Sequence, residues 1–70
     1  MILGESELEM ARRHVAEGER HVRLQHEIIE HLQSLGAPTD VAEQLRRQFE
    51  ELLAMHRQHL AKLEGLDAAS

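Results

Sequence analysis

The sequence predicts an all-α fold, namely an antiparallel two-helix hairpin that pairs with a second copy into a dimeric four-helix bundle. Two long segments carry apolar residues at helical spacing, and one short segment with Gly36 and Pro38 separates them. The chain has 70 residues and no cysteine, so its own core is small and disulfides cannot reinforce it. The first segment carries two apolar stripes, and a single neighbouring helix covers only one of them.

The first helix is expected at about residues 6–35. The S-x-x-E pattern from Ser6 to Glu9 is that of a capping box, in which the serine hydroxyl and the glutamate carboxylate bind orphan amides of the first turn. At the other end, Gly36 suits the left-handed position after a helix, and Pro38 cannot continue one. No proline or cluster of turn residues interrupts the segment between these signals.

The second helix is expected at about residues 40–64, after a turn at residues 36–40. Either Asp40 or Thr39 can cap its start, and Gly65 is the expected C-cap. The small and polar residues after it are expected to fray. A connection this short makes the two helices antiparallel, and the hairpin should be about 40 Å long.

Composition argues against several classes of protein. Hydrophobic residues make up 41% of the chain and charged residues 30%, which is too apolar for a disordered tail. The net charge of −5 is spread over both halves with acids and bases interleaved, so nucleic acids and membranes are not the expected partners. The run from Met1 to Leu3 gives way at once to Gly4 and Glu5, which argues against a signal peptide. We therefore expect a cytoplasmic protein.

Apolar stripes on the two helices identify the residues expected at helix interfaces. In the first helix, one stripe runs from Leu8 to Leu32 and a second runs beside it from Met10 to Leu35. In the second helix, most leucines share one arc with Phe49. The margin of that arc carries Val41, Met55, His59 and Leu66. The expected interface residues are Leu8, Val15, Val22, Leu24, Ile28, Ile29, Leu32, Leu45, Phe49, Leu52, Leu53, His56, Leu60 and Leu63.

The second stripe of the first helix is the reason for expecting a homodimer. The chain offers no third helix to cover it, and two hairpins related by a two-fold axis are the simplest solution. An unknown protein partner would use the same surface. The stripe can also be interpreted as a wide apolar margin on a monomeric hairpin, covered by its own long side chains.

Six histidines are the unusual feature of the composition. Residues whose numbers sum to about 75 should lie at one level of the hairpin, which brings His14, His21, His56 and His59 into one region. Glu17 and His21 are four residues apart on one helix face, and with His56 across from them they form a candidate ligand set for Zn²⁺ or a similar ion. The same histidines can instead sense pH, or form a polar layer that fixes the register of the helices.

Catalysis is not expected. The segment from His26 to His31 looks like the zinc-protease motif H-E-x-x-H but has one residue too many, so its two histidines diverge by about 140° around the helix. The sequence contains no G-x-S-x-G motif and no glycine-rich phosphate loop, and two helices do not readily enclose a ligand-sized cavity. We expect neither an enzyme nor a cofactor.

Three stretches of the sequence support a resemblance that covers the whole chain. The R-H-V-x-E-G-E-R-H-V run from Arg13 to Val22, the turn from Gly36 to Asp40 and the E-E-L-L-x-x-H run from Glu50 to His56 are similar to short, uncharacterised bacterial helical-hairpin proteins. This resemblance implies a hairpin and supplies neither a function nor site residues. By architecture alone, the hairpin also resembles the dimeric RNA-binding protein Rop, although the acidic balance and a core position for Phe49 disfavour Rop-like binding.

These features predict a non-enzymatic protein–protein interaction module, a small dimerising regulator or adaptor. One alternative is a metal- or pH-responsive regulator that uses the histidine cluster. The other is a Rop-like RNA-binding hairpin.

Overall fold

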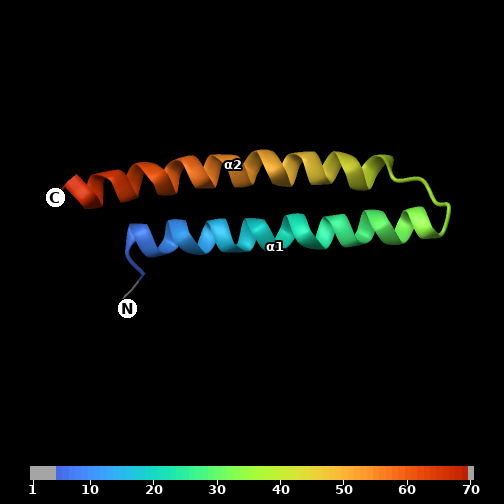
Figure 1. Ribbon diagram of the computed structural model, residues 1–70, viewed down its shortest axis with the longest axis horizontal. Helices are drawn as coiled ribbons and strands as arrows, with labels where there is room; N and C mark the ends of the chain where they lie inside the picture. Colours follow the sequence, from blue (N-terminus) through green and yellow to red (C-terminus); the bar gives the residue numbers. More distant parts are fainter. Residues whose placement is uncertain (1–4, 70) are drawn as a thin grey trace.

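The computed structural model describes residues 5–69 as two helices that lie side by side in opposite directions (Figure 1). α1 spans Glu7–Ser34 and α2 spans Asp40–Ala69. Side chains are described as far as Leu66, and no strand occurs in the described part of the chain. The predicted all-α hairpin is confirmed, but at 53 Å it is longer than the expected length of about 40 Å. The expectations for Met1 to Gly4 and for Ser70 fall outside the described residues.

The start of α1 is the predicted capping box. The amide of Glu9 donates to Oγ of Ser6 at 3.1 Å, and the amide of Ser6 donates to Oε1 of Glu9 at 3.3 Å. Two backbone donors that the helix itself cannot satisfy thus find acceptors. Such a cap contributes about 1 kcal/mol, which is enough to decide where a helix begins.

α1 ends in a Schellman motif centred on Gly36. The amide of Ala37 donates to the carbonyl of Leu32 at 2.9 Å, and the amide of Gly36 donates to the carbonyl of Gln33 at 3.1 Å. Gly36 has a φ of 69°, a conformation that strains any residue with a Cβ atom. The glycine therefore stops the helix, and Pro38 follows where the helix can no longer continue.

α2 begins with Thr39 in the N-cap position. The carbonyl of Thr39 accepts from the amide of Glu43 at 2.8 Å, and its hydroxyl donates to Oε2 of Glu43 at 2.6 Å. Of the two caps that the sequence allows, the structure uses Thr39. Asp40 and Glu43 occupy the first turn, where the helix dipole favours negative charge.

The prediction that α2 ends near residue 64 with Gly65 as its C-cap is wrong. The helix continues through Gly65 to Ala69, and Gly36 is the only described glycine with a positive φ. A single glycine inside a helix costs about 1 kcal/mol relative to alanine. No proline follows Gly65, so this cost alone does not stop the helix.

The two helices pack along a narrow core and come close together at Gly18. A Cβ atom placed on Gly18 would lie 3.0 Å from Cδ1 of Leu53 and 3.7 Å from its Cα. The missing side chain thus lets the backbone of α2 come close to α1 near the middle of the hairpin. Leu53 is only 6% exposed as a result, and this contact explains a glycine inside α1 that lowers helix propensity.

Gln25 is the buried polar residue of the described core. Its Nε2 donates to the carbonyl of Ala42 at 2.9 Å, which satisfies the amide and joins α1 to the first turn of α2. A buried polar side chain with one suitable acceptor favours a single register of the two helices. The apolar members of this core are Ala11, Ile29, Ala42 and Leu53.

No helix in the described part of the chain is both long enough and apolar enough to cross a membrane.

Candidate functional site

The large apolar side chains that the hairpin leaves exposed follow the same pattern on both helices. On α1, Ile28 directly precedes the buried Ile29, and on α2, Leu52 directly precedes the buried Leu53. Ile28 is 47% exposed and Leu52 is 50% exposed, against 8% for Ile29 and 6% for Leu53. Each helix therefore has an exposed apolar stripe one residue before its core stripe.

The two exposed stripes lie on the same side of the hairpin. One residue corresponds to a rotation of about 100° around the helix axis. Because the helices are antiparallel, the same one-residue offset turns both stripes toward the same side. We call this side the apolar face, and its exposed members are Met10, Leu24, Ile28, Leu35, Val41, Leu45, Leu52 and Met55.

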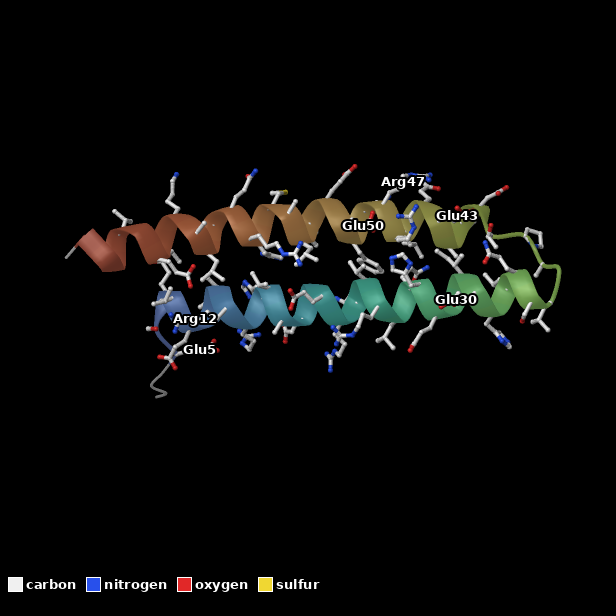
Figure 2. The ribbon with its side chains drawn as sticks, in the orientation of Figure 1. Glu5, Arg12, Glu30, Glu43, Arg47 and Glu50 are labelled. Atoms are coloured by element: carbon white, nitrogen blue, oxygen red, sulfur yellow. The ribbon has the colours of Figure 1, made fainter. Side chains whose placement is uncertain are left out.

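The opposite side of the hairpin carries ion pairs between the helices, and we call it the ion-pair side. The charged residues there follow the core stripes by one position, and they recur every seven residues on each helix. The pairs are Arg12 with Glu64 at 3.9 Å, His26 with Glu50 at 3.8 Å and Arg57 with Glu19 at 3.1 Å. Exposed pairs of this kind stabilise a fold only slightly, but those of Arg12 and Arg57 each neutralise a basic side chain. Arg47 projects from the outer side of α2, away from α1 (Figure 2).

The structure divides the predicted interface residues into two groups. Those that are buried or half-buried are Leu8, Val15, Val22, Ile29, Leu32, Phe49, Leu53, His56, Leu60 and Leu63. Those exposed on the apolar face are Leu24, Ile28, Leu45 and Leu52. The apolar pattern of the sequence puts Leu45 and Leu52 on one arc with Leu53. A single partner helix covers only part of so wide an arc, and these two residues lie beyond the covered part.

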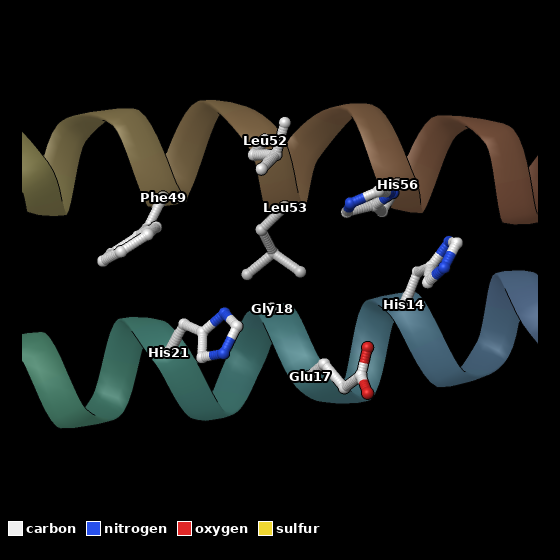
Figure 3. Close-up of a pocket in the computed structure, with 8 residues that line it drawn as sticks. All are labelled: His14, Glu17, Gly18, His21, Phe49, Leu52, Leu53 and His56. Carbon is white, nitrogen blue, oxygen red and sulfur yellow. The ribbon is translucent and has the colours of Figure 1, made fainter.

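A pocket of about 110 Å³ opens between the helices on the apolar face. Its rim is formed by His14, Glu17 and His21 from α1 and by Phe49, Leu52 and His56 from α2 (Figure 3). Leu53 points toward Gly18 between them (Figure 3). Leu52 is the member of the apolar face that lines this pocket, and α1 contributes polar side chains and Gly18 to it.

Two ring contacts bridge the helices at this pocket. The rings of His14 and His56 have centroids 5.1 Å apart and planes inclined at 44°. The rings of His21 and Phe49 have centroids 5.6 Å apart and planes inclined at 40°. His14 and His56 are half-buried, whereas His21 is exposed. The pocket therefore pairs one histidine with another and one histidine with the aromatic residue.

The predicted ligand set of Glu17, His21 and His56 lines the pocket, but the three do not form a ligand group. His56 lies against His14, and within the described residues no three His, Asp or Glu side chains are placed to hold one metal ion. The difference comes from which residues meet at the pocket. The predicted register puts Gly18 level with Arg57, whereas Leu53, about one helical turn away, lies against Gly18. On the ion-pair side Arg57 does lie near the predicted level, paired with Glu19.

His59 also lies apart from the histidine pair. Its Nε2 is 3.9 Å from Oε1 of Glu7 at the open end of the hairpin, and it does not line the pocket. Of the four histidines expected in one region, the structure therefore brings together His14, His21 and His56.

Acidic side chains lie beside the pocket on α1. Arg13 donates to both carboxylate oxygens of Glu5, at 2.9 and 3.0 Å, and to both oxygens of Glu17 at 3.3 Å. The hydrogen bonds from Arg13 lower the pKa of the Glu5 carboxyl, and the charge of His14 acts in the same direction. The pKa of Arg13 is raised, chiefly by its hydrogen bond to Glu5. Of these three side chains only Glu17 lines the pocket, and Arg13 joins it to Glu5.

The arrangement offers two kinds of interaction. The apolar face can exclude water against another apolar surface, and the pocket presents imidazole nitrogens near carboxylates. Comparison of the chain with family models, curated proteins and solved structures finds no match.

Proposed function

We propose that the chain is a non-enzymatic protein–protein interaction module, a small regulator or adaptor that forms a homodimer through its apolar face. The observation that carries this proposal is the one-sided distribution of side chains. Both helices present large exposed apolar residues to one side, and both present charged residues to the other, where three pairs join the helices. The pair of Glu7 with His59 at the open end of the hairpin is the exception. Contiguous exposed apolar residues of this kind mark interaction sites.

A second copy of the chain fits this face well. Two hairpins that dock through two-helix faces form a four-helix bundle, in which exposed stripes with 3-4 spacing interdigitate. A two-fold axis lets one surface patch serve both partners, so no second complementary surface is needed. The core of the single hairpin is small, and among the described residues its buried apolar side chains are Ala11, Ile29, Ala42 and Leu53. Such a core favours reinforcement by a partner.

Charge favours a protein partner over RNA. Arg12 and Arg57 on the ion-pair side have acidic partners across the helices, so they offer little uncompensated positive charge to phosphates. Phe49, which is half-buried, packs against His21 and is not presented as an exposed stacking platform. The net charge of −5 acts in the same direction.

Light scattering of the purified chain tests the proposal. We expect a mass of about twice the 8.0 kDa of one chain at micromolar concentration. Far-ultraviolet circular dichroism of the same sample should show a helical protein. A helical sample whose mass stays at one chain over the whole concentration range would contradict the proposal.

A further inference from the structure

The contact between His14 and His56 brings together two imidazoles from different helices. Their centroids are 5.1 Å apart, and both rings are half-buried at the rim of the pocket (Figure 3). Among the described residues, the two rings contact each other, and neither has a hydrogen bond or an ion pair with a protein group. Their ring nitrogens are therefore available to a ligand from solution.

The separation of the two rings matches that of two imidazoles bound to one tetrahedral metal ion. A Zn–N bond of about 2.0–2.1 Å and a distance of about 1.1 Å from ring nitrogen to ring centre put each centroid about 3.2 Å from the metal. Two such rings at the tetrahedral angle have centroids about 5.2 Å apart, against the observed 5.1 Å. Rotation about χ2 exchanges nitrogen and carbon positions without moving the ring centre, so either nitrogen can turn toward the ion.

The surroundings of the two rings favour a dication. Glu17 follows His14 by one helical turn and lines the same pocket. Arg13 donates to Glu17 and to Glu5, and one guanidinium neutralises only one of their two negative charges. The remaining negative charge at this end of α1 attracts a dication.

We propose that His14 and His56 bind one divalent transition-metal ion of the Zn²⁺ class between α1 and α2. Each chain supplies these two ligands, in agreement with the lack of a three-ligand group among the described residues, and water completes the coordination. Imidazole pairs select ions such as Zn²⁺ over Mg²⁺, which prefers oxygen ligands. The bound ion would join the two helices in the half of the hairpin that lies away from the turn. This site requires only one chain and does not rest on the proposed dimer.

Urea unfolding of the untagged chain in increasing ZnCl₂ tests the site, at fixed protein concentration and with circular dichroism as the signal. Once free Zn²⁺ exceeds the dissociation constant, each tenfold increase should lower the unfolding equilibrium constant about tenfold, as one bound ion requires. MgCl₂ at the same concentrations should produce no such change, and chelation by EDTA should reverse the effect of Zn²⁺. An equal response to Mg²⁺ would overturn the proposal.

Three matched variants separate this pair from other histidines. His14→Asn and His56→Asn should each lose most of the Zn²⁺ response, whereas His59→Asn should keep it. The third variant matters because His56 and His59 are three residues apart on α2 and could bind an ion without α1. Retention of the response in His14→Asn with its loss in His59→Asn would overturn the proposal.

Nuclear magnetic resonance of the wild-type chain gives a readout that depends on no variant. Zn²⁺ should shift the ring signals of His14 and His56 in parallel, with saturation at one ion per chain. The ring signals of His26 and His31, which do not line the pocket, should stay in place. Parallel shifts of all the histidines, or shifts that exclude His14, would contradict a site between the helices.

Discussion

Replacement of Ile28 by glutamate is expected to dissociate the dimer. Ile28 is 47% exposed in the single hairpin and lies on the apolar face, so the change removes little packing within one chain. In a homodimer it places a carboxylate from each copy in an apolar interface, which costs several kcal/mol when no partner is present. The dissociation constant measured by sedimentation equilibrium should rise at least about a hundredfold, or about 2.8 kcal/mol.

Ala54→Glu is the matched control for this change. Ala54 is exposed, and it follows the buried Leu53 by one position, so it lies on the ion-pair side between Glu50 and Arg57. The same carboxylate introduced there stays in water and should change the dissociation constant less than about threefold. Equal effects of Ile28→Glu and Ala54→Glu would show that the apolar face is not the dimer interface.

Replacement of Gly18 by leucine is expected to destabilise the hairpin by about 1–3 kcal/mol. A Cβ atom alone would already lie 3.0 Å from Cδ1 of Leu53, and the rest of the side chain must displace α2. Leucine is a much better helix former than glycine, so helix propensity by itself predicts the opposite sign. Urea unfolding at fixed protein concentration measures the change.

Gly65→Leu provides the control, because no atom lies within 4 Å of a Cβ placed on Gly65. This second glycine also sits inside a helix, so its replacement should stabilise the chain by up to about 1 kcal/mol. Leu53→Ala combined with Gly18→Leu should recover part of the stability lost in the single Gly18 variant, since space then opens opposite the new side chain. Stabilisation by Gly18→Leu alone would contradict the close approach of the helices.

The fold class and most helix ends could be predicted because short-range hydrogen bonds encode them. Ser6 and Glu9 form their cap within one helical turn. At the end of α1 the amide of Gly36 donates to the carbonyl three residues before it, and the amide of Ala37 donates to the carbonyl five residues before it. The end of α2 was harder to predict, because Gly65 can either cap a helix or lie inside one. The low helix propensity of glycine costs only about 1 kcal/mol, and this cost is too small to end α2 at Gly65.

The faces of the hairpin depend on longer-range information. The apolar pattern of the sequence predicts the second stripe on α1 but puts Leu45 and Leu52 in the core arc of α2. Val41 and Met55, at the margin of that arc, are the residues that could have revealed an exposed stripe on α2 beside its core. Each exposed stripe precedes its core stripe by one residue. Once the antiparallel pairing is known, this equal offset puts both stripes on one side of the hairpin.

The pairing of the histidines could not be predicted because it depends on the register between helices. A shift of about one turn changes which side chains meet while leaving each apolar stripe in place. Gly18 and Gln25 set the observed register, through the close contact with Leu53 and the bond to the carbonyl of Ala42. Neither interaction is visible in the periodicity of the sequence. His14 therefore replaces His21 as the neighbour of His56.

Thiol protection tests the central claim, that a second copy covers the apolar face, most directly. The chain has no cysteine, so Ile28→Cys and Ala54→Cys each introduce one thiol, on the apolar face and on the ion-pair side respectively. As protein concentration rises through the dissociation constant, the rate at which a maleimide reacts with the thiol at position 28 should fall at least about tenfold. The rate at position 54 should change little. Equal and concentration-independent rates at the two positions would contradict the account.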